Sequence, residues 1–302
     1  MLGAKPFIKW AGGKGQLLEK FESLYPRGLK DGKIDMYVEP FVGGGAVLFA
    51  VLQKYDVKRA VIFDVNKELI NCYGCIKNRL SGVLCELAAI NDGYNASADK
   101  EAFFYEVRND YNKIKLNGRF DEVKAARFIF LNKTCFNGLY RVNGGGGFNV
   151  PFGRYKNPNI TDKKNLTAVS DILQRVEIFH GDYGLCRNFL NDKAFVYFDP
   201  PYRPVTETGK FVGYSKDGFN DGDQIALSEF VGQIDQTGCK IMLSNSDPKN
   251  NDINDNFFDR LYEGFYIDRI RAKRVINCQA AKRGDITEIV VRNYRGENPN
   301  DN

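Results

Sequence analysis

The chain has 302 residues, 43% of them apolar, which is enough for one large domain or two small ones with a sizeable core. Its Lys and Arg exceed its Asp and Glu, and the net charge of +5 is compatible with a polyanionic partner without requiring one. The single histidine, His180, argues against a Ser-His-Asp triad and is interpreted as structural, and the seven cysteines lack zinc-ligand spacing, so we expect reduced thiols and no metal.

Taken from the N-terminus, residues 1–6 lack the apolar region of a signal peptide, and no later run is long enough for a membrane span. We therefore expect a cytoplasmic protein with no membrane partner. Strands are predicted at 36–39, 60–64, 176–182, 195–199, 240–245, 264–270 and 287–293, and helices at 14–24, 45–55, 67–76 and 221–236. Strands that alternate with helices predict an α/β fold with a doubly wound, Rossmann-like sheet.

The region 78–170 breaks this alternation. Residues 97–116 and 121–132 have apolar positions at helical spacing, and 135–155 is rich in glycine, aromatic and basic residues. Because this region is too long for a crossover and too structured for a linker, we predict an inserted, mainly helical subdomain at 78–170. The main domain then comprises 1–77 and 171–302.

A glycine turn, Phe41-Val42-Gly43-Gly44-Gly45, joins the first predicted strand to a helix, and Asp64 ends the next strand about 20 residues later. Glycines there let a ligand approach the backbone, and an acid at that distance suits a ribose, so the pair favours a nucleoside-containing cofactor. The alternative is a tight turn with a helix-capping aspartate. Asp182 and Tyr183 end the third strand, at the edge where an adenine ring would lie, which alone is a weak signal.

Near the N-terminus, Gly12-Gly13-Lys14-Gly15 superficially resembles a phosphate-binding loop. The glycine spacing is wrong and no Ser or Thr follows the lysine, so ATP hydrolysis is rejected. The neighbouring Trp10 could belong to the core or could cover a ligand.

Residues 137–154 read as a hairpin with a glycine tip at 144–147, carrying Asn137, Arg141 and Arg154. Arginine can contact guanine with two hydrogen bonds, so such a ribbon suits a DNA groove. The alternative is an ordinary surface hairpin.

The most informative motif is Asp199-Pro200-Pro201-Tyr202, which follows a buried strand. Two prolines make a stiff loop at the strand's carboxyl edge. There Asp199 can accept one hydrogen of a ring amino group, a backbone carbonyl can accept the other, and Tyr202 can stack on the ring. A capped strand end with a structural tyrosine is the alternative.

Together these motifs resemble the Dam family of DNA adenine-N6 methyltransferases, the D12 class (alpha group), over nearly the whole chain. The matching segments are 7–14, 39–45, Asp64, the hairpin, 199–202 and 243–247, and residues 282–284 with 288–290 resemble the family's closing segment near phosphates. The resemblance implies S-adenosylmethionine as methyl donor, double-stranded DNA as partner, the target sequence GATC, and an adenine flipped out of the helix for methylation at N6. We expect a monomer in solution, with more than one copy able to bind DNA.

The resemblance and the motifs together assign three groups of site residues. The predicted catalytic residues are Asp199, Pro200 and Tyr202. The predicted donor-binding residues are Trp10, Lys14, Glu39, Phe41, Gly43, Gly45, Asp64, Asp182, Tyr183 and Asp199. The predicted DNA-binding residues are Lys9, Phe136, Asn137, Leu139, Arg141, Pro151 and Arg154.

Three other functions are compatible with parts of the pattern. An N-methyltransferase acting on RNA or on a protein amide needs the same acid, proline and aromatic, but it leaves the hairpin unexplained. A non-catalytic DNA-binding protein on this fold would be expected to lack Asp199 or Tyr202. A nicotinamide oxidoreductase would use the Gly43–Gly45 turn, but it leaves the Pro-Pro loop unexplained.

Overall fold

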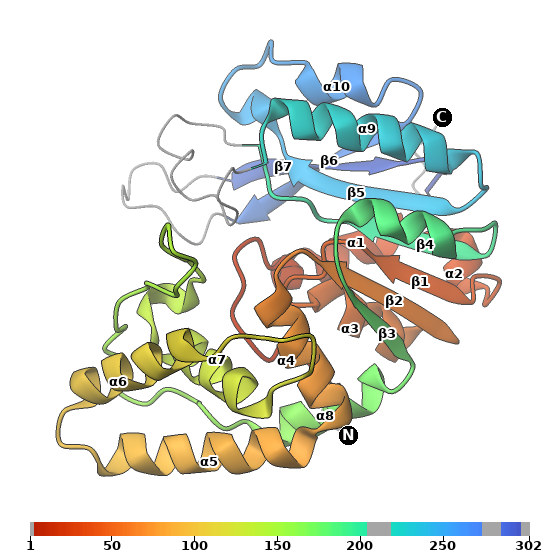
Figure 1. The fold of residues 1–302 in the computed structure, drawn as a ribbon. Coiled ribbons are helices and arrows are strands. Elements are labelled where there is room, and N and C mark those ends of the chain that lie inside the picture. Colours follow the sequence, from red (N-terminus) through yellow and green to blue (C-terminus); the bar gives the residue numbers. More distant parts are fainter. Residues whose placement is uncertain (1–2, 204–218, 274–284, 297–302) are drawn as a thin grey trace. The chain divides into compact units, whose positions relative to one another are not determined.

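The computed structural model describes residues 3–203, 219–273 and 285–296 (Figure 1). These residues form two compact units that the chain enters more than once. Unit 1 comprises Met1–Gly13, Val42–Gln53 and Phe63–Gly181, and unit 2 comprises Lys14–Phe41, Lys54–Ile62 and Asp182–Asn302. The predicted division into 78–170 and the rest of the chain stays a prediction.

A seven-stranded sheet organises the fold, with strand order β3-β2-β1-β4-β5-β7-β6. The strands are β1 (Met36–Glu39), β2 (Arg59–Asp64), β3 (Val176–His180), β4 (Ala194–Phe198), β5 (Lys240–Ser246), β6 (Tyr266–Lys273) and β7 (Asp285–Arg292). β1 pairs in parallel with β2 and β4, and β4 with β5, whereas β7 runs antiparallel to both β5 and β6. The chain therefore has the mixed α/β, Rossmann-like fold that the sequence predicts.

The parallel register brings functional segments to one edge of unit 2. Val38 is opposite Val196, and Phe198 is opposite Leu243, so the chain leaves β1 and β4 and reaches the end of β5 at the same edge (Figure 1). β1 and β4 are buried along their whole length, as strands covered on both faces must be.

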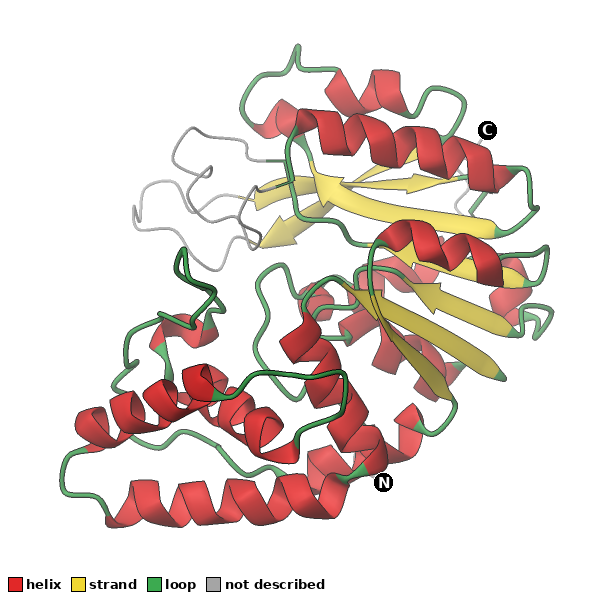
Figure 2. Ribbon diagram, viewed as in Figure 1, coloured by secondary structure: helices red, strands yellow, loops and turns green. Residues whose placement is uncertain are grey.

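Unit 1 is mainly helical, as the red ribbons of Figure 2 show. Its helices are α3 (Ala46–Lys54, up to Gln53), α4 (Lys67–Asn78), α5 (Leu80–Ala96), α6 (Lys100–Lys113), α7 (Glu122–Thr134) and α8 (Lys163–Leu173), with the 3-10 turn η2 (Phe136–Gly138). Unit 2 carries η1 (Lys14–Gln16), α1 (Leu18–Leu24), α2 (Arg27–Lys30), η3 (Tyr183–Phe189), α9 (Asp221–Asp235), η5 (Pro248–Asn250) and α10 (Phe257–Leu261).

The predicted strands lie within three residues of the observed ones, and the helices differ more. The helix predicted at 14–24 is wrong as one element, because Leu17 separates η1 from α1. α6 begins at Lys100 rather than near 97, since the Asp99 side chain accepts the amides of Glu101 and Ala102 and caps the helix there. α5 was not predicted; it buries Val83, Leu87 and Tyr94, but two glycines lower its helix propensity.

The predicted hairpin is antiparallel but lacks regular strands. Isolated bridges join Cys135 to Phe152 and Val142 to Phe148, and the Asn143 amide donates to the Gly147 carbonyl around the glycine tip. Six of the seven cysteines lie in the described ranges, and all six are free thiols; Cys278 lies outside these ranges.

Candidate active site

In unit 2 the Asp199 carboxylate lies just after β4 and is held by two side chains. The Lys14 ammonium is 2.7 Å from Asp199 Oδ1, and the Ser244 hydroxyl of β5 donates to the same oxygen at 3.1 Å. The Lys14 side chain is buried, with 4% exposed, whereas 19% of the Asp199 side chain is exposed. Burial raises the pKa of Asp199, and Lys14 and Ser244 oppose that rise. The carboxylate is thus fixed but still reachable.

Tyr202 completes the motif and contacts the same lysine. The Lys14 ammonium lies 4.5 Å from the centre of the Tyr202 ring, and the Tyr202 hydroxyl donates to Glu288 of β7. A cation over an aromatic face is attracted by the ring's quadrupole. Lys14 therefore joins the acid and the aromatic of the motif.

A buried amide pair fixes the loop between these residues. The Gln224 amide donates to the Pro201 carbonyl at 3.0 Å, and Asn245 Oδ1 accepts the Arg203 backbone amide at 3.2 Å. The Asn245 amide in turn donates to Gln224 Oε1 at 3.1 Å, and both side chains are fully buried. Since the prolines have no amide hydrogen, these contacts secure the loop on either side of Tyr202.

The predicted donor-binding residues of unit 2 include an aromatic group beside β1 and β4. Phe41 stacks on Tyr183 with ring centres 5.5 Å apart, and Tyr183 packs edge-on against Phe230. Asp182 is exposed and caps η3, its Oδ1 accepting the Gly184 amide at 2.8 Å. Glu39 is 2% exposed, and its carboxylate accepts the Tyr37 hydroxyl of the same strand.

In unit 1 the glycine turn is shaped by close contacts. Gly43 has φ +47°, and a Cβ placed on it would lie 2.7 Å from Trp10 Cδ1. At Gly45, with φ +72°, a Cβ would lie 2.6 Å from the Tyr73 hydroxyl, which donates to the Gly43 carbonyl. Both positions require glycine for conformation and for space. Trp10 also stacks on Tyr140, with ring centres 5.7 Å apart.

Asp64, at the end of β2, receives two backbone amides. Its Oδ2 accepts from Gly43 at 3.1 Å and its Oδ1 from Asn66 at 2.8 Å. Burial raises the pKa of Asp64 to about 6, although both amides and His180 act to lower it. Each carboxylate oxygen can accept a further hydrogen bond, as a ribose diol would require.

The predicted DNA-binding residues in unit 1 are organised by buried Asn132. Its amide donates to the carbonyls of Lys9 and Gly138, and its Oδ1 accepts the Lys9 backbone amide at 2.8 Å. Gly138 has φ +63° and packs against the Lys9 side chain. The Lys9 ammonium is 4.6 Å from the Tyr155 ring centre. Lys9 is therefore brought beside the turn that carries Phe136, Asn137 and Leu139.

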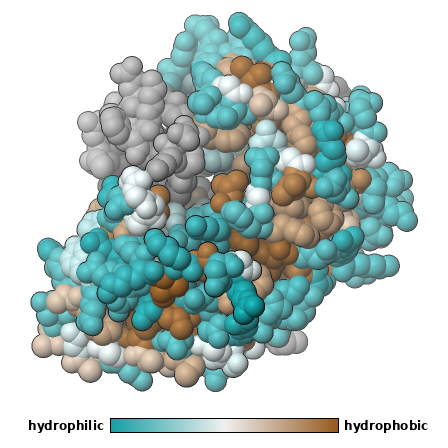
Figure 3. Space-filling model, in the orientation of Figure 1, coloured by the Kyte–Doolittle hydropathy of each residue, from teal (hydrophilic) through white to brown (hydrophobic). Residues whose placement is uncertain are grey.

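That turn presents side chains to the surface. Phe136 is 51% exposed, and its amide donates to the Pro151 carbonyl at 2.9 Å, so the two sides of the hairpin lie together. Asn137 has φ +55°, a left-handed conformation that asparagine tolerates better than most residues. On the face drawn in Figure 3, hydrophilic residues predominate, with small hydrophobic areas among them.

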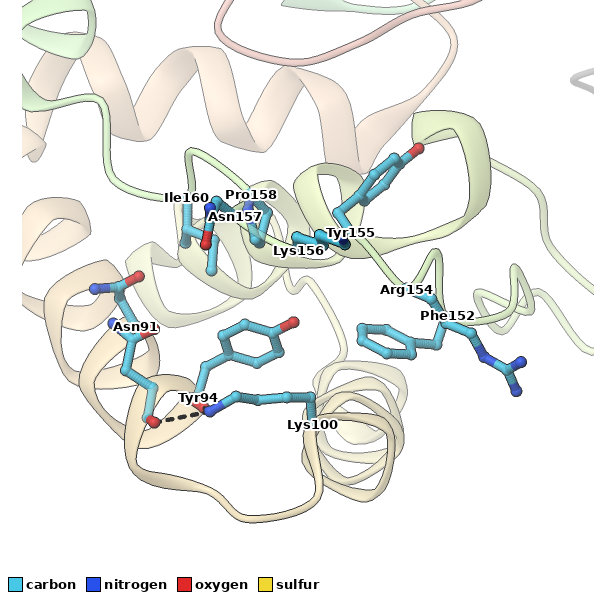
Figure 4. A pocket seen from close by; sticks show the side chains of 11 residues that line it. Asn91, Tyr94, Lys100, Phe152, Arg154, Tyr155, Lys156, Asn157, Pro158 and Ile160 are labelled. Carbon is cyan, nitrogen blue, oxygen red and sulfur yellow. Dashed lines mark hydrogen bonds between the residues drawn. The ribbon is translucent and has the colours of Figure 1, made fainter.

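The two predicted arginines have acidic or amide partners. Exposed Arg141 donates from Nε to Asn149 Oδ1 at 2.7 Å, across the hairpin. Arg154 pairs with Glu101 at 3.1 Å. Arg154 also borders a pocket of about 410 Å³, but its side chain projects away from Tyr94 and Lys100 on the other side (Figure 4). The Lys100 ammonium donates to three carbonyls at the end of α5, so it caps the carboxyl end of that helix.

Sequence reasoning missed the residues that support the loop from Asp199 to Tyr202. Ser244 and Asn245 lie in a segment that carried the family resemblance, but no pattern in the sequence assigned them a role. Gln224 had no signal at all, since it is one polar residue in an amphipathic helix. Residues 282–284 lie outside the described residues.

Comparisons with known proteins agree with this fold and motif order. Residues 10–276 match the family model of D12 class N6 adenine-specific DNA methyltransferases. The chain is 50% identical over 295 residues to the type II methyltransferase M.MjaIII of Methanocaldococcus jannaschii, covering 96% of this chain and 99% of that protein. It is 37% identical to M1.LlaDCHI of Lactococcus lactis subsp. cremoris, covering 97% and 96%. It is 31% identical to the DNA adenine methylase of Escherichia coli K12, covering 80% and 81%.

An α/β sheet with an acidic Pro-Pro-Tyr loop at its carboxyl edge, together with these matches, identifies an S-adenosylmethionine-dependent methyltransferase. The chain belongs to the D12 class of N6 adenine-specific DNA methyltransferases. DNA is thus its substrate and S-adenosylmethionine its methyl donor. Among the described residues, no helix is long and apolar enough to cross a bilayer, and no cluster of His, Cys, Asp or Glu is placed to hold a metal ion.

Proposed function

We propose that the protein methylates N6 of adenine within duplex GATC, after the adenine has been flipped out of the helix. The observation that carries the catalytic part is the Asp199 carboxylate, fixed beside Tyr202 by Lys14 and Ser244. The GATC part rests on the family resemblance of the hairpin and on its exposed side chains.

Adenine N6 is a poor nucleophile because its lone pair is delocalised into the ring. In the proposed mechanism Asp199 accepts one amino hydrogen and the Pro200 carbonyl accepts the other, which favours a more pyramidal nitrogen. Among the described residues, the contacts of Asp199 with Lys14 and Ser244 both go to Oδ1, so Oδ2 can accept the amino group. A hydrogen bond to a charged group contributes about 1.5–3 kcal/mol.

Tyr202 would stack on the flipped base and offset part of the cost of unstacking, which is about a few kcal/mol. The Lys14 ammonium lies over one face of this ring. Adenine therefore either uses the opposite face of Tyr202 or displaces Lys14. If adenine displaces Lys14, the ion pair between Lys14 and Asp199 is lost. The hydrogen bond from adenine N6 to Asp199 would then take its place.

The chain's own residues fit S-adenosylmethionine, which supplies an electrophilic methyl group on its sulfonium. We propose that Asp64 accepts the ribose hydroxyls, and that the Gly43–Gly45 turn, Trp10, Lys14 and Glu39 line the site. Phe41, Asp182 and Tyr183 would hold the adenine ring of S-adenosylmethionine, and Asp199 would face its methionine part. With both reactants held in line, catalysis consists mostly of positioning.

For DNA recognition we propose residues 78–170 as the recognition subdomain, within a catalytic domain of 1–77 and 171–302. Lys9, Phe136, Asn137, Leu139, Arg141, Pro151 and Arg154 would contact the duplex. Arg141 suits a guanine, since its guanidinium keeps donors beyond those bonded to Asn149. The protein would act as a monomer in solution, which sedimentation analysis can test.

The test uses radiolabelled S-adenosylmethionine with three substrates: a GATC duplex, a scrambled duplex of equal composition, and the corresponding RNA. We expect label only in the first, and the product should resist a nuclease blocked by GATC adenine methylation. Asp199→Asn should abolish transfer with the fold intact. Asp192→Asn, an exposed acid before β4, serves as the matched control. Label in the scrambled duplex would refute the GATC assignment, and label in RNA alone would refute the DNA substrate.

A further inference from the structure

Glu288 is a partly buried acid on β7 that the mechanism above does not use. In the antiparallel β5–β7 register it lies opposite Ser246, and Val290 lies opposite Ser244, so Glu288 and Ser244 project from the same face of the sheet. Ser244 binds Asp199, and Glu288 binds the Tyr202 hydroxyl. Asp199 is therefore held by a residue of β5, and Tyr202 by a residue of β7.

An acid at this position is electrostatically unfavourable without a specific partner. Burial and the nearby Asp199 carboxylate raise the pKa of Glu288, and the Lys14 ammonium and the Tyr202 hydroxyl lower it. Two acids thus share one buried lysine. A residue that only filled space would not need a hydrogen-bond acceptor here.

The contact matters because of what it constrains in Tyr202. The backbone beside Tyr202 is fixed by Asn245 through Arg203, but a tyrosine ring can still turn about its side-chain bonds. The Glu288 carboxylate fixes the far end of the ring. Two fixed ends define the plane on which the target base would stack, and that plane sets where the amino group meets Asp199.

We propose that Glu288 is a positioning residue for methyl transfer, which acts by orienting the Tyr202 ring through its hydroxyl. The inference rests on the proposed stacking role of Tyr202. Glu288 acts here as a hydrogen-bond acceptor, and its negative charge is not required.

The experiment is a double-mutant cycle on single-turnover methylation of a GATC duplex. Glu288→Met keeps side-chain length but removes the acceptor, and we expect the rate to fall about 10- to 100-fold, the equivalent of one hydrogen bond of about 1.5–3 kcal/mol. Tyr202→Phe should cause a similar loss, and the double variant should be no slower than either single variant. Glu288→Gln keeps an acceptor and should stay within about threefold of the wild type.

Two further measurements separate positioning from folding and binding. Far-ultraviolet circular dichroism reports the fold, and the KM for S-adenosylmethionine should stay constant while kcat falls. Glu229→Gln, at an exposed acid on α9, is the control and should change neither. If Glu288→Met fails to fold, the pairing of Glu288→Gln with Tyr202→Phe still decides, because the proposal requires a near-normal rate for the first and a slow rate for the second.

Three results would overturn this inference without affecting the proposed function. They are rate losses that multiply in the double variant, a slow methylation rate for Glu288→Gln, and a normal rate for Glu288→Met. If the wild type transfers no methyl group to DNA, the proposed function fails and this inference fails with it. The wild-type reaction run in parallel therefore distinguishes the two failures.

Discussion

Replacing Asn245 by alanine tests whether the buried amide pair sets the geometry of the catalytic loop. The change leaves three groups without this partner: the backbone amides of Arg203 and Ser246, at 3.2 and 2.8 Å from Oδ1, and Gln224 Oε1, at 3.1 Å from the amide nitrogen. The Ser246 hydroxyl, which also donates to Oδ1 at 3.4 Å, keeps its bond to the Arg203 carbonyl. A buried polar group left unsatisfied costs about 1–3 kcal/mol. We expect a loss of about 3 kcal/mol in the free energy of unfolding, near the lower bound, because Ser246 is only half-buried and can gain water.

The same change should affect catalysis more than stability alone explains. Without Asn245, the Arg203 amide loses its acceptor, and the Gln224 side chain that bonds the Pro201 carbonyl loses its donor. The positions of Asp199 and Tyr202 relative to each other are then no longer fixed. A displacement of about 1 Å can reduce a rate about 100-fold, and we expect a loss of that order in the single-turnover rate. Urea unfolding followed by circular dichroism gives the stability, and methylation is measured at a temperature where the variant is folded.

Asn293→Ala is the matched control within the same sheet. Asn293, just after β7, also makes partly buried contacts, accepting the Ile241 amide at 2.7 Å and donating to Asp235 and the Cys239 carbonyl, but at the start of β5 rather than its end. It should lose comparable stability while the methylation rate of the folded protein stays near normal. Equal rate losses in both variants, or less than about 1 kcal/mol lost in Asn245→Ala, would refute the reasoning.

Three further predictions concern Lys14, Asp64 and Arg141. Lys14→Met should destabilise the protein by about 3 kcal/mol, the lower end for removing one partner of a buried ion pair, because Asp199 is 19% exposed and keeps its Ser244 hydrogen bond. The same change should raise the pKa of Asp199 and move the acidic limb of the pH–rate profile to higher pH, and an unmoved limb would contradict this. With a pKa of about 6, Asp64 should make S-adenosylmethionine binding tighter as pH rises from about 5 to 7, and calorimetry should find this dependence reduced in Asp64→Asn. Arg141→Ala should weaken discrimination at one base pair by about 1–3 kcal/mol in competition assays, whereas uniform weakening across all sequences would indicate a phosphate contact.

The sequence determined much of the local structure because local chemistry specifies it. Short apolar runs bounded by turn residues are typical of strands buried on both faces, so β1 and β4 were predictable to within one residue. The Gly43 turn was predictable for the same kind of reason, since its positive φ and its contact with Trp10 need a residue without a Cβ. Asp199 and Tyr202 were recognisable because two prolines between them leave few conformations for the loop.

Only the tertiary structure decided which distant side chains serve that loop. Lys14 lies 185 residues before Asp199, and Asn245 and Gln224 lie on a separate strand and helix; their contacts depend on strand register and helix packing, which no local pattern encodes. Glu288 meets Tyr202 because β7 runs antiparallel to β5, and a shift of one residue would turn it to the other face of the sheet. The motif can be found in the sequence, but the register of the sheet determines that Ser244 and Glu288 contact Asp199 and Tyr202.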